Sequence, residues 1–180
     1  ALAQEDEDNP WVKICNMDPN VNKEVCLITQ ELRTDRGQFL ASVAIREIEG
    51  ESDRLLLASV PVGMLLQQGV QLQVDGAEPQ RANYQICFPN ACYAEMRIQG
   101  DYINKLKRGG NLKITALNQQ AKPVPFDFTL IGFTAAYEGE GMNPNELQAR
   151  NEQLEQELNR RAAEARERLI EAQRDALESE

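Results

Sequence analysis

The chain has 180 residues, a formal net charge of −10 and no histidine. The acidic balance argues against binding to nucleic-acid backbones or anionic membrane surfaces, because both need clustered lysine and arginine. The lack of histidine removes the commonest general base, the commonest zinc ligand and every Ser-His or Cys-His catalytic arrangement.

The first nine residues are expected to precede the folded domain. Ala1-Leu2-Ala3 matches the small-x-small end of a secretory signal whose charged and apolar regions are missing, with a chance tripeptide or vector scar as the alternative. Residues 4–9 have no apolar group to bury and should form a disordered acidic lead-in. No apolar run in the chain approaches the roughly 20 residues that a membrane helix needs, so we expect no integral membrane segment.

Short apolar segments joined by Gly, Pro and Asn turns predict that residues 10–141 form one mainly β domain. Residues 38–48 alternate between apolar and polar side chains, as a half-buried strand should. Residues 54–60 form a near-continuous apolar run, which suits a strand buried on both faces. Many short strands of this kind predict a β-sandwich or a partly open β-barrel. Further strands are expected at 11–15, 25–29, 70–76, 111–117 and 124–132.

One short helix is expected inside the β domain, at residues 101–109. Asp101 has the residue type of an N-cap, basic residues occupy the last turn, and Gly109 follows the end of the helix.

The four cysteines, Cys15, Cys26, Cys87 and Cys92, predict two disulfide bonds. Cys87 and Cys92 bracket a Pro-Asn turn, and facing positions of an antiparallel hairpin lie within disulfide reach. Four cysteines allow three pairings, and the local one, 15 to 26 and 87 to 92, is favoured because both spans are short. A zinc site built from all four cysteines is the rival interpretation, although zinc knuckles normally have closer spacing.

The chain changes character at residue 143, where a long helix is predicted to run to residue 180. Asn143 has the residue type of an N-cap, Pro144 follows at the first helical position, and Glu146 supplies the acid of a capping box. Small and apolar residues recur close to coiled-coil spacing, with one four-residue stutter near 158–162. We therefore expect a charged, coiled-coil-like helix that supports a weak homodimer through residues 146–177, with a solvated, partly frayed helix as the alternative. The residues proposed for self-association are Leu147, Asn151, Leu154, Leu158 and Leu169.

No pattern of residues in the sequence predicts a catalytic, cofactor or metal site. Carboxylates are plentiful but scattered, and no phosphate-binding glycine loop is present. A non-enzymatic interaction protein is therefore favoured, with a small secreted carboxylate-based hydrolase or a ligand-binding β domain as the alternatives. A deep pocket in which two carboxylates converge would favour the hydrolase, whereas a filled core with surface grooves would favour binding.

Several motifs together resemble one protein family over roughly residues 10–138. They are Trp11 with Cys15 and Cys26, residues 61–70 (PVGMLLQQGV) leading to Val74-Asp75, Cys87 to Cys92 with Ala94, and residues 130–136 (LIGFTAA). In these motifs the chain is similar to the invasion-associated locus B family of Gram-negative bacteria.

The resemblance implies an exported protein that is periplasmic or envelope-associated. Together with the cleavage motif at residues 1–3, it leads us to expect a cleaved signal peptide and a periplasmic, envelope-associated or extracellular location. The family takes its name from a locus linked to entry into host red blood cells, so a protein partner in the envelope or on a host cell is expected. The resemblance supplies no catalytic residue, and the helix after residue 143 is outside the family pattern.

Overall fold

The computed structural model describes residues 9–178. The chain divides into two compact units, and the boundary in the sequence lies between Gly141 and Met142. The first is called the β unit below. The predicted cleavage motif and the acidic lead-in up to residue 8 lie outside the described residues. Asn9, the last residue of that lead-in, is anchored. Its Nδ2 donates to the carbonyl oxygen of Gly132 at 3.0 Å, and its Oδ1 accepts from the amide of Trp11 at 3.0 Å.

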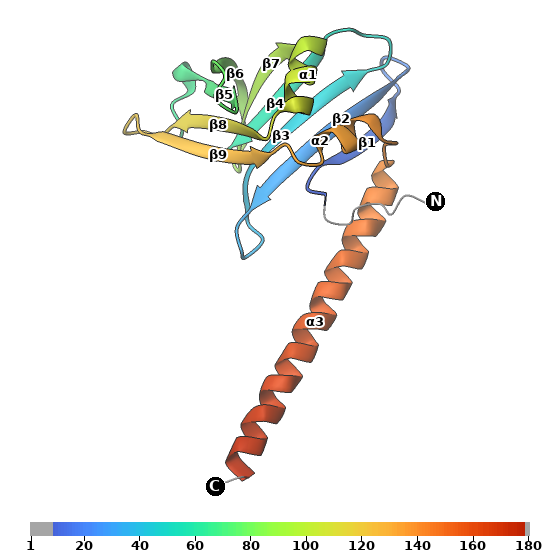
Figure 1. Cartoon of the computed structure of the whole chain (residues 1–180), viewed down its shortest axis with the longest axis vertical. Coiled ribbons are helices and arrows are strands. Elements are labelled where there is room, and N and C mark those ends of the chain that lie inside the picture. The colour runs from blue at the N-terminus through green and yellow to red at the C-terminus, as the bar shows by residue number, and fades with distance from the viewer. Residues whose placement is uncertain (1–8, 179–180) are drawn as a thin grey trace. The chain divides into compact units, whose positions relative to one another are not determined.

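Within the described residues, the β unit contains nine strands, two α-helices and one 3-10 turn, and the second unit contains one long helix (Figure 1). The elements are β1 Val12–Asp18, β2 Lys23–Arg33, β3 Phe39–Ile48, β4 Arg54–Val60, η1 Leu66–Gln68, β5 Val70–Val74, β6 Gln80–Cys87, β7 Cys92–Ile98, α1 Gly100–Arg108, β8 Asn111–Leu117, β9 Pro123–Thr129, α2 Phe133–Glu138 and α3 Pro144–Glu178.

All nine strands belong to one antiparallel sheet in the order β1-β2-β3-β4-β7-β6-β5-β8-β9. The sheet curls, so that β5, β8 and β9 lie over β2, β3 and β4 (Figure 1). The prediction of a mainly β domain is thus confirmed in its partly open barrel form. Helix α1 contacts β7 and α2, and α2 contacts β1.

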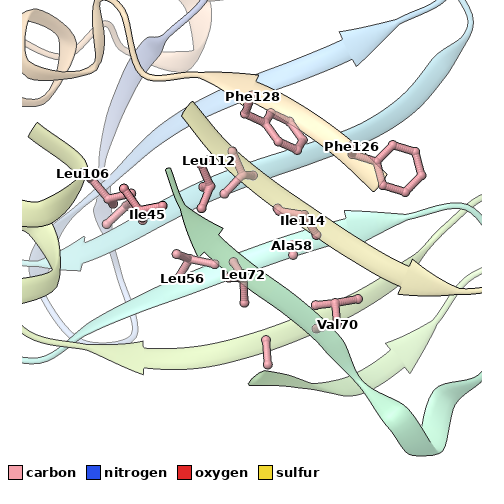
Figure 2. Packing of buried hydrophobic residues seen from close by; sticks show 14 of the residues in the cluster. Ile45, Leu56, Ala58, Val70, Leu72, Leu106, Leu112, Ile114, Phe126 and Phe128 are labelled. Carbon is pink, nitrogen blue, oxygen red and sulfur yellow. The ribbon is translucent and has the colours of Figure 1, made fainter. Parts of the chain in front are cut away.

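The curled sheet encloses a single apolar core. Ile45 of β3, Leu56 of β4, Leu72 of β5 and Ile114 of β8 all belong to this cluster of buried side chains (Figure 2). Phe128 of β9 covers the same cluster and is fully buried. Burial of each such large side chain contributes about 1.5–3 kcal/mol, so side chains fill the inside of the half-barrel and hold its two walls together.

The first and last strands of the sheet do not pair with each other, and side chains join them instead. The indole Nε1 of Trp11 donates to the carbonyl oxygen of Thr129 at 2.7 Å, and Gln30 Nε2 donates to the same oxygen at 3.3 Å. The Trp11 ring packs edge-on against Phe133 with centroids 4.9 Å apart. These contacts connect β2 and the residue before β1 to the last residue of β9 and to α2.

The N-cap of helix α1 lies two residues earlier than predicted. Gln99 occupies the N-cap position and Asp101 lies in the first turn, so the prediction of Asp101 as the cap was wrong. Gly109 ends the helix with extended backbone rather than the left-handed geometry typical of such glycines. Its role is close packing, because a Cβ there would come within 2.7 Å of Val74 Cγ1 and 2.8 Å of Leu130 Cδ1.

The strand predicted for residues 124–132 ends at Thr129, and the family motif at residues 130–136 leads into α2 and forms its first four residues. Gly132 has a φ of +87° and turns the chain into the helix. A Cβ at Gly132 would also collide with the side chain of Asn9. The glycine thus allows both the turn and the contact that anchors the N-terminal segment.

Helix α3 starts with the predicted capping box. The amide of Glu146 donates to Asn143 Oδ1 at 3.0 Å, and the amide of Asn143 donates to Glu146 Oε2 at 2.9 Å. Within residues 9–178, no helix is long and apolar enough to cross a membrane.

Candidate interaction surface

The sheet of the β unit has an inner face on the core and an outer face turned away from it. Residues that pair side by side across five strands form one row of the outer face. That row is Ile14, Leu27, Arg46, Leu55 and Arg97. None of these side chains is buried. A mixed surface of aliphatic and arginine side chains therefore crosses the sheet from β1 to β7.

The next row of the outer face has a similar character. It consists of Val12, Thr29, Ala44, Leu57 and Glu95, all partly exposed. Leu55 and Leu57 lie in these two rows, so strand β4 is not buried on both faces as predicted from its continuous apolar run. Its inward residues are in the core, and its outward leucines remain available for contact.

An open groove of about 310 Å³ lies on this face where β3, β4 and β7 meet. Ile48 and Leu55 supply apolar lining, and charged side chains of both signs complete it. They are Arg46, Arg54 and Arg97 together with Glu51, Asp53 and Glu95. Arg46 and Arg97 are exposed on either side of Leu55. Among the described residues, neither the Arg46 side chain nor the Arg97 side chain has a hydrogen-bond or ion-pair partner. The groove can therefore accept an apolar segment and pair two guanidinium groups with acceptors on the bound molecule.

The hairpin that joins β6 to β7 extends the apolar part of the outer face. Ile86 pairs with Tyr93, and Phe88 packs edge-on against the Tyr93 ring at 5.7 Å. Ile86 and Phe88 are about half exposed, at 51% and 50%. Exposed aromatic side chains held in a fixed geometry are typical of protein-binding surfaces.

Both predicted disulfides are present in the structure. Cys15 bonds to Cys26 across β1 and β2, and Cys87 bonds to Cys92 across the hairpin of β6 and β7. Because all four sulfur atoms are engaged in disulfides, none can serve as a thiolate ligand, and the zinc interpretation of the cysteines was wrong.

The five residues proposed for self-association all lie on α3. Leu147 is half-buried and the other four are exposed, so their side chains are accessible, and the proposed seam stays a prediction.

A polar cluster that the sequence did not reveal lies at one end of the inner face. Glu47 Oε1 accepts from Arg54 Nε at 2.5 Å and also from the hydroxyl of Tyr137. Arg54 Nε lies 2.9 Å from the Tyr137 hydroxyl oxygen. Lys13 Nζ donates to the carbonyl oxygens of Tyr137 and Gly139 at 2.9 and 3.1 Å. The cluster ties α2 to strands β1, β3 and β4.

This cluster borders a second open hollow, of about 290 Å³, to which Glu24, Glu47, Glu49 and Glu51 contribute. Glu47 is engaged by both Arg54 and Tyr137, so its carboxylate has a structural role in the polar cluster. No spacing in the sequence could have identified this arrangement, because Tyr137 is 90 residues from Glu47.

Three tyrosines are expected to ionise late when the pH is raised. Burial, followed by the hydrogen bond to Glu47, raises the pKa of Tyr137 to about 12, and burial raises the pKa values of Tyr84 and Tyr102 to about 12. These values exceed the value near 10 of an unfolded chain. The native state therefore loses stability as the pH rises from about 10 to about 12.

An ultraviolet titration of tyrosinate measures this difference directly. Folded protein should keep the three groups protonated beyond pH 11, and the same chain in concentrated denaturant should ionise them near pH 10. Ionisation of all tyrosines near pH 10 in protein that is still folded would show that these side chains are solvated.

Known proteins resemble this chain in sequence and in fold. The model of the family described as "Invasion associated locus B (IalB) protein" matches residues 11–141. Two proteins called invasion protein B homolog, from two strains of Brucella abortus, are each 27% identical over 129 residues, covering 70% of this chain and 72% of their own length. The crystal structure of invasion associated protein B from Bartonella henselae has a TM-score of 0.64 at 21% identity. That match covers 81% of this chain and 95% of the other, and it supports the fold.

Proposed function

The chain belongs to the invasion-associated locus B family, and from this membership we propose that it is an exported, non-enzymatic protein that binds a protein partner. The partner belongs to the bacterial envelope or to a host cell. Entry into host cells, erythrocytes in particular, is the biological setting that the family suggests. The periplasm or the cell exterior fits the two disulfides, because such bonds persist in oxidising compartments.

The observation that carries the proposal is the groove on the outer face. Leu55 lies between Arg46 and Arg97 in register across three strands, and both arginines are exposed. Apolar surface combined with arginine is the composition that protein interfaces favour. In contrast, the inside of the sheet is filled by the core, and Glu47 is held by Arg54 and Tyr137. These features favour binding over a carboxylate-based hydrolase.

Capture from envelope extract and from erythrocyte membranes tests the proposal. The immobilised full chain should enrich a specific protein, and the double variant Arg46→Glu/Arg97→Glu should retain at least tenfold less of it, because the two exposed groove cations become anions. The matched control is Arg36→Glu/Lys122→Glu, which changes the net charge equally at two exposed turn residues. The control should capture as well as the natural chain.

A chain that ends at Gly141 separates the contribution of the β unit from that of α3. The shortened chain should capture the same protein with unchanged yield. Equal capture by the groove variant, or capture that requires α3, would refute the assignment of the outer face.

A further inference from the structure

Helix α3 has a leucine every eleven residues, at 147, 158 and 169. An 11-residue repeat corresponds to about 3.67 residues per turn, so such a stripe follows one face of a nearly straight helix. Leu154 lies on the same face. Leu154, Leu158 and Leu169 are 55%, 55% and 66% exposed. The stripe is therefore accessible to a second molecule.

Charged residues of alternating sign follow one flank of this stripe. They are Arg150, Glu157, Arg161, Glu164, Arg168 and Asp175. The series is symmetric about the midpoint between residues 162 and 163, with each base matched by an acid at the same distance on the other side. The matched pairs are Arg161 with Glu164, Glu157 with Arg168, and Arg150 with Asp175.

We propose that two copies of the chain associate through α3 as an antiparallel coiled coil centred near residue 162. In an antiparallel pair, the two-fold axis brings each flank of one helix against the same flank of the other. If residues at equal distances on the two sides of the centre have opposite charges, the flank of one copy is complementary to the same flank of the other copy. Each of the three matched pairs forms twice, and none of these contacts joins like charges.

The side chains of the seam agree with the same arrangement. With the flanks in this register, Leu147 lies opposite Ala176 of the second copy, Leu158 opposite Ala165, and Leu154 opposite Leu169. Most layers therefore combine a large residue with a small one, which keeps the seam even in width along its length. On the other flank, the same register brings Glu155 opposite Arg166.

A parallel pair of helices would have uneven layers in the seam and poorly matched charges on the flanks. Residues of equal number would share a layer, so that leucine layers in the first half would be followed by thin alanine layers in the second. Arg161 would face Arg166 of the second copy, because flanks of parallel helices meet five residues apart. Asn151 would face itself, which suits a parallel coil, but the alternating flank charges would find few partners.

The flank side chains are accessible for these contacts. Arg161 pairs with Glu157 one turn earlier in its own helix, and their side chains remain 68% and 46% exposed. Arg160 lies 3.6 Å from Glu164, whose side chain is 48% exposed. Neither intrahelical pair is buried, so both acids can also receive an arginine from a second helix.

Sedimentation equilibrium of full-length charge variants tests the orientation. Arg161→Glu places two acids opposite each other twice in the antiparallel pair and should raise the dimer dissociation constant about tenfold. Arg161→Glu/Glu164→Arg restores opposite charges and should recover the original constant. Arg174→Glu is the control, because it changes the net charge equally on the far side of the helix and should leave the constant unchanged.

Cross-linking gives a second readout that does not depend on charge. Chains with Gln148→Cys and chains with Gln173→Cys, mixed and treated with a short bismaleimide, should link to each other and not to themselves. In the antiparallel pair, two copies of residue 148 lie roughly 37 Å apart at 1.5 Å per residue.

Three results would overturn the proposal. They are tighter association of Arg161→Glu, self-linking of the Gln148→Cys chain, and a monomeric full-length chain at tens of micromolar. This proposal is independent of partner binding by the outer face, because its variants lie on α3 alone.

Discussion

Replacing Trp11 with alanine is expected to destabilise the β unit by about 3–5 kcal/mol, the range for removal of a large buried aromatic side chain. The ring is 3% exposed, packs edge-on against Phe133, and donates from its Nε1 to the carbonyl oxygen of Thr129. The substitution would leave a cavity at the junction between the two ends of the sheet. Because stabilities of 5–15 kcal/mol are usual, the loss is a large part of the total.

Denaturant unfolding followed by circular dichroism measures this loss, since the substitution removes the single tryptophan of the chain. Trp11→Phe is the matched control. It keeps an aromatic ring against Phe133 and removes the hydrogen bond to Thr129, so a smaller loss is expected. A change below about 1 kcal/mol for Trp11→Ala would mean that this junction contributes little to stability.

Removing both disulfides is expected to cost about 5 kcal/mol. Cys15–Cys26 and Cys87–Cys92 are separated by 11 and 5 residues. In the chain-entropy model, these loops correspond to about 2.8 and about 2.2 kcal/mol. Replacement of all four cysteines by alanine should therefore lower the unfolding midpoint sharply or prevent folding at 37 °C.

Each pair can be removed separately to divide this loss. The Cys15→Ala/Cys26→Ala chain should lose more than the Cys87→Ala/Cys92→Ala chain, because its closed loop is longer. The natural chain with an added reductant should unfold at the midpoint of the four-alanine chain. An unchanged midpoint in reductant, with free thiols verified by alkylation, would contradict the expectation.

Local features were predictable where neighbouring residues determine the structure. Strands β4 and β8 have the predicted bounds, and the Cys87–Cys92 hairpin closes as expected, since the Phe88 amide donates to the Ala91 carbonyl oxygen at 2.8 Å. The start of α3 was readable because its capping box lies within four residues. In each case the controlling contacts are short in sequence.

Long-range features were not predictable from spacing. The pairing of β4 with β7 and of β5 with β8 depends on the curl of the sheet, and the sequence carries no pattern for it. The Glu47–Arg54–Tyr137 cluster depends on the position of α2, a helix that the sequence did not predict. The outer face was hidden by the continuous apolar run of β4, because such a run does not distinguish inward from outward leucines.

The junction between Trp11 and Thr129 also has a consequence for the order in which the chain can fold. These two residues are 118 positions apart, and Phe133 lies farther still. A chain that emerges N-terminus first from a ribosome or a translocation channel therefore keeps Trp11 exposed until nearly the whole β unit has followed. Strands β1 to β4 can pair earlier, but their inner face remains exposed to solvent until β5, β8 and β9 have been synthesised. Completion of the core is thus coupled to synthesis of the last strand, so the β unit reaches its native packing only when nearly all of its residues are available.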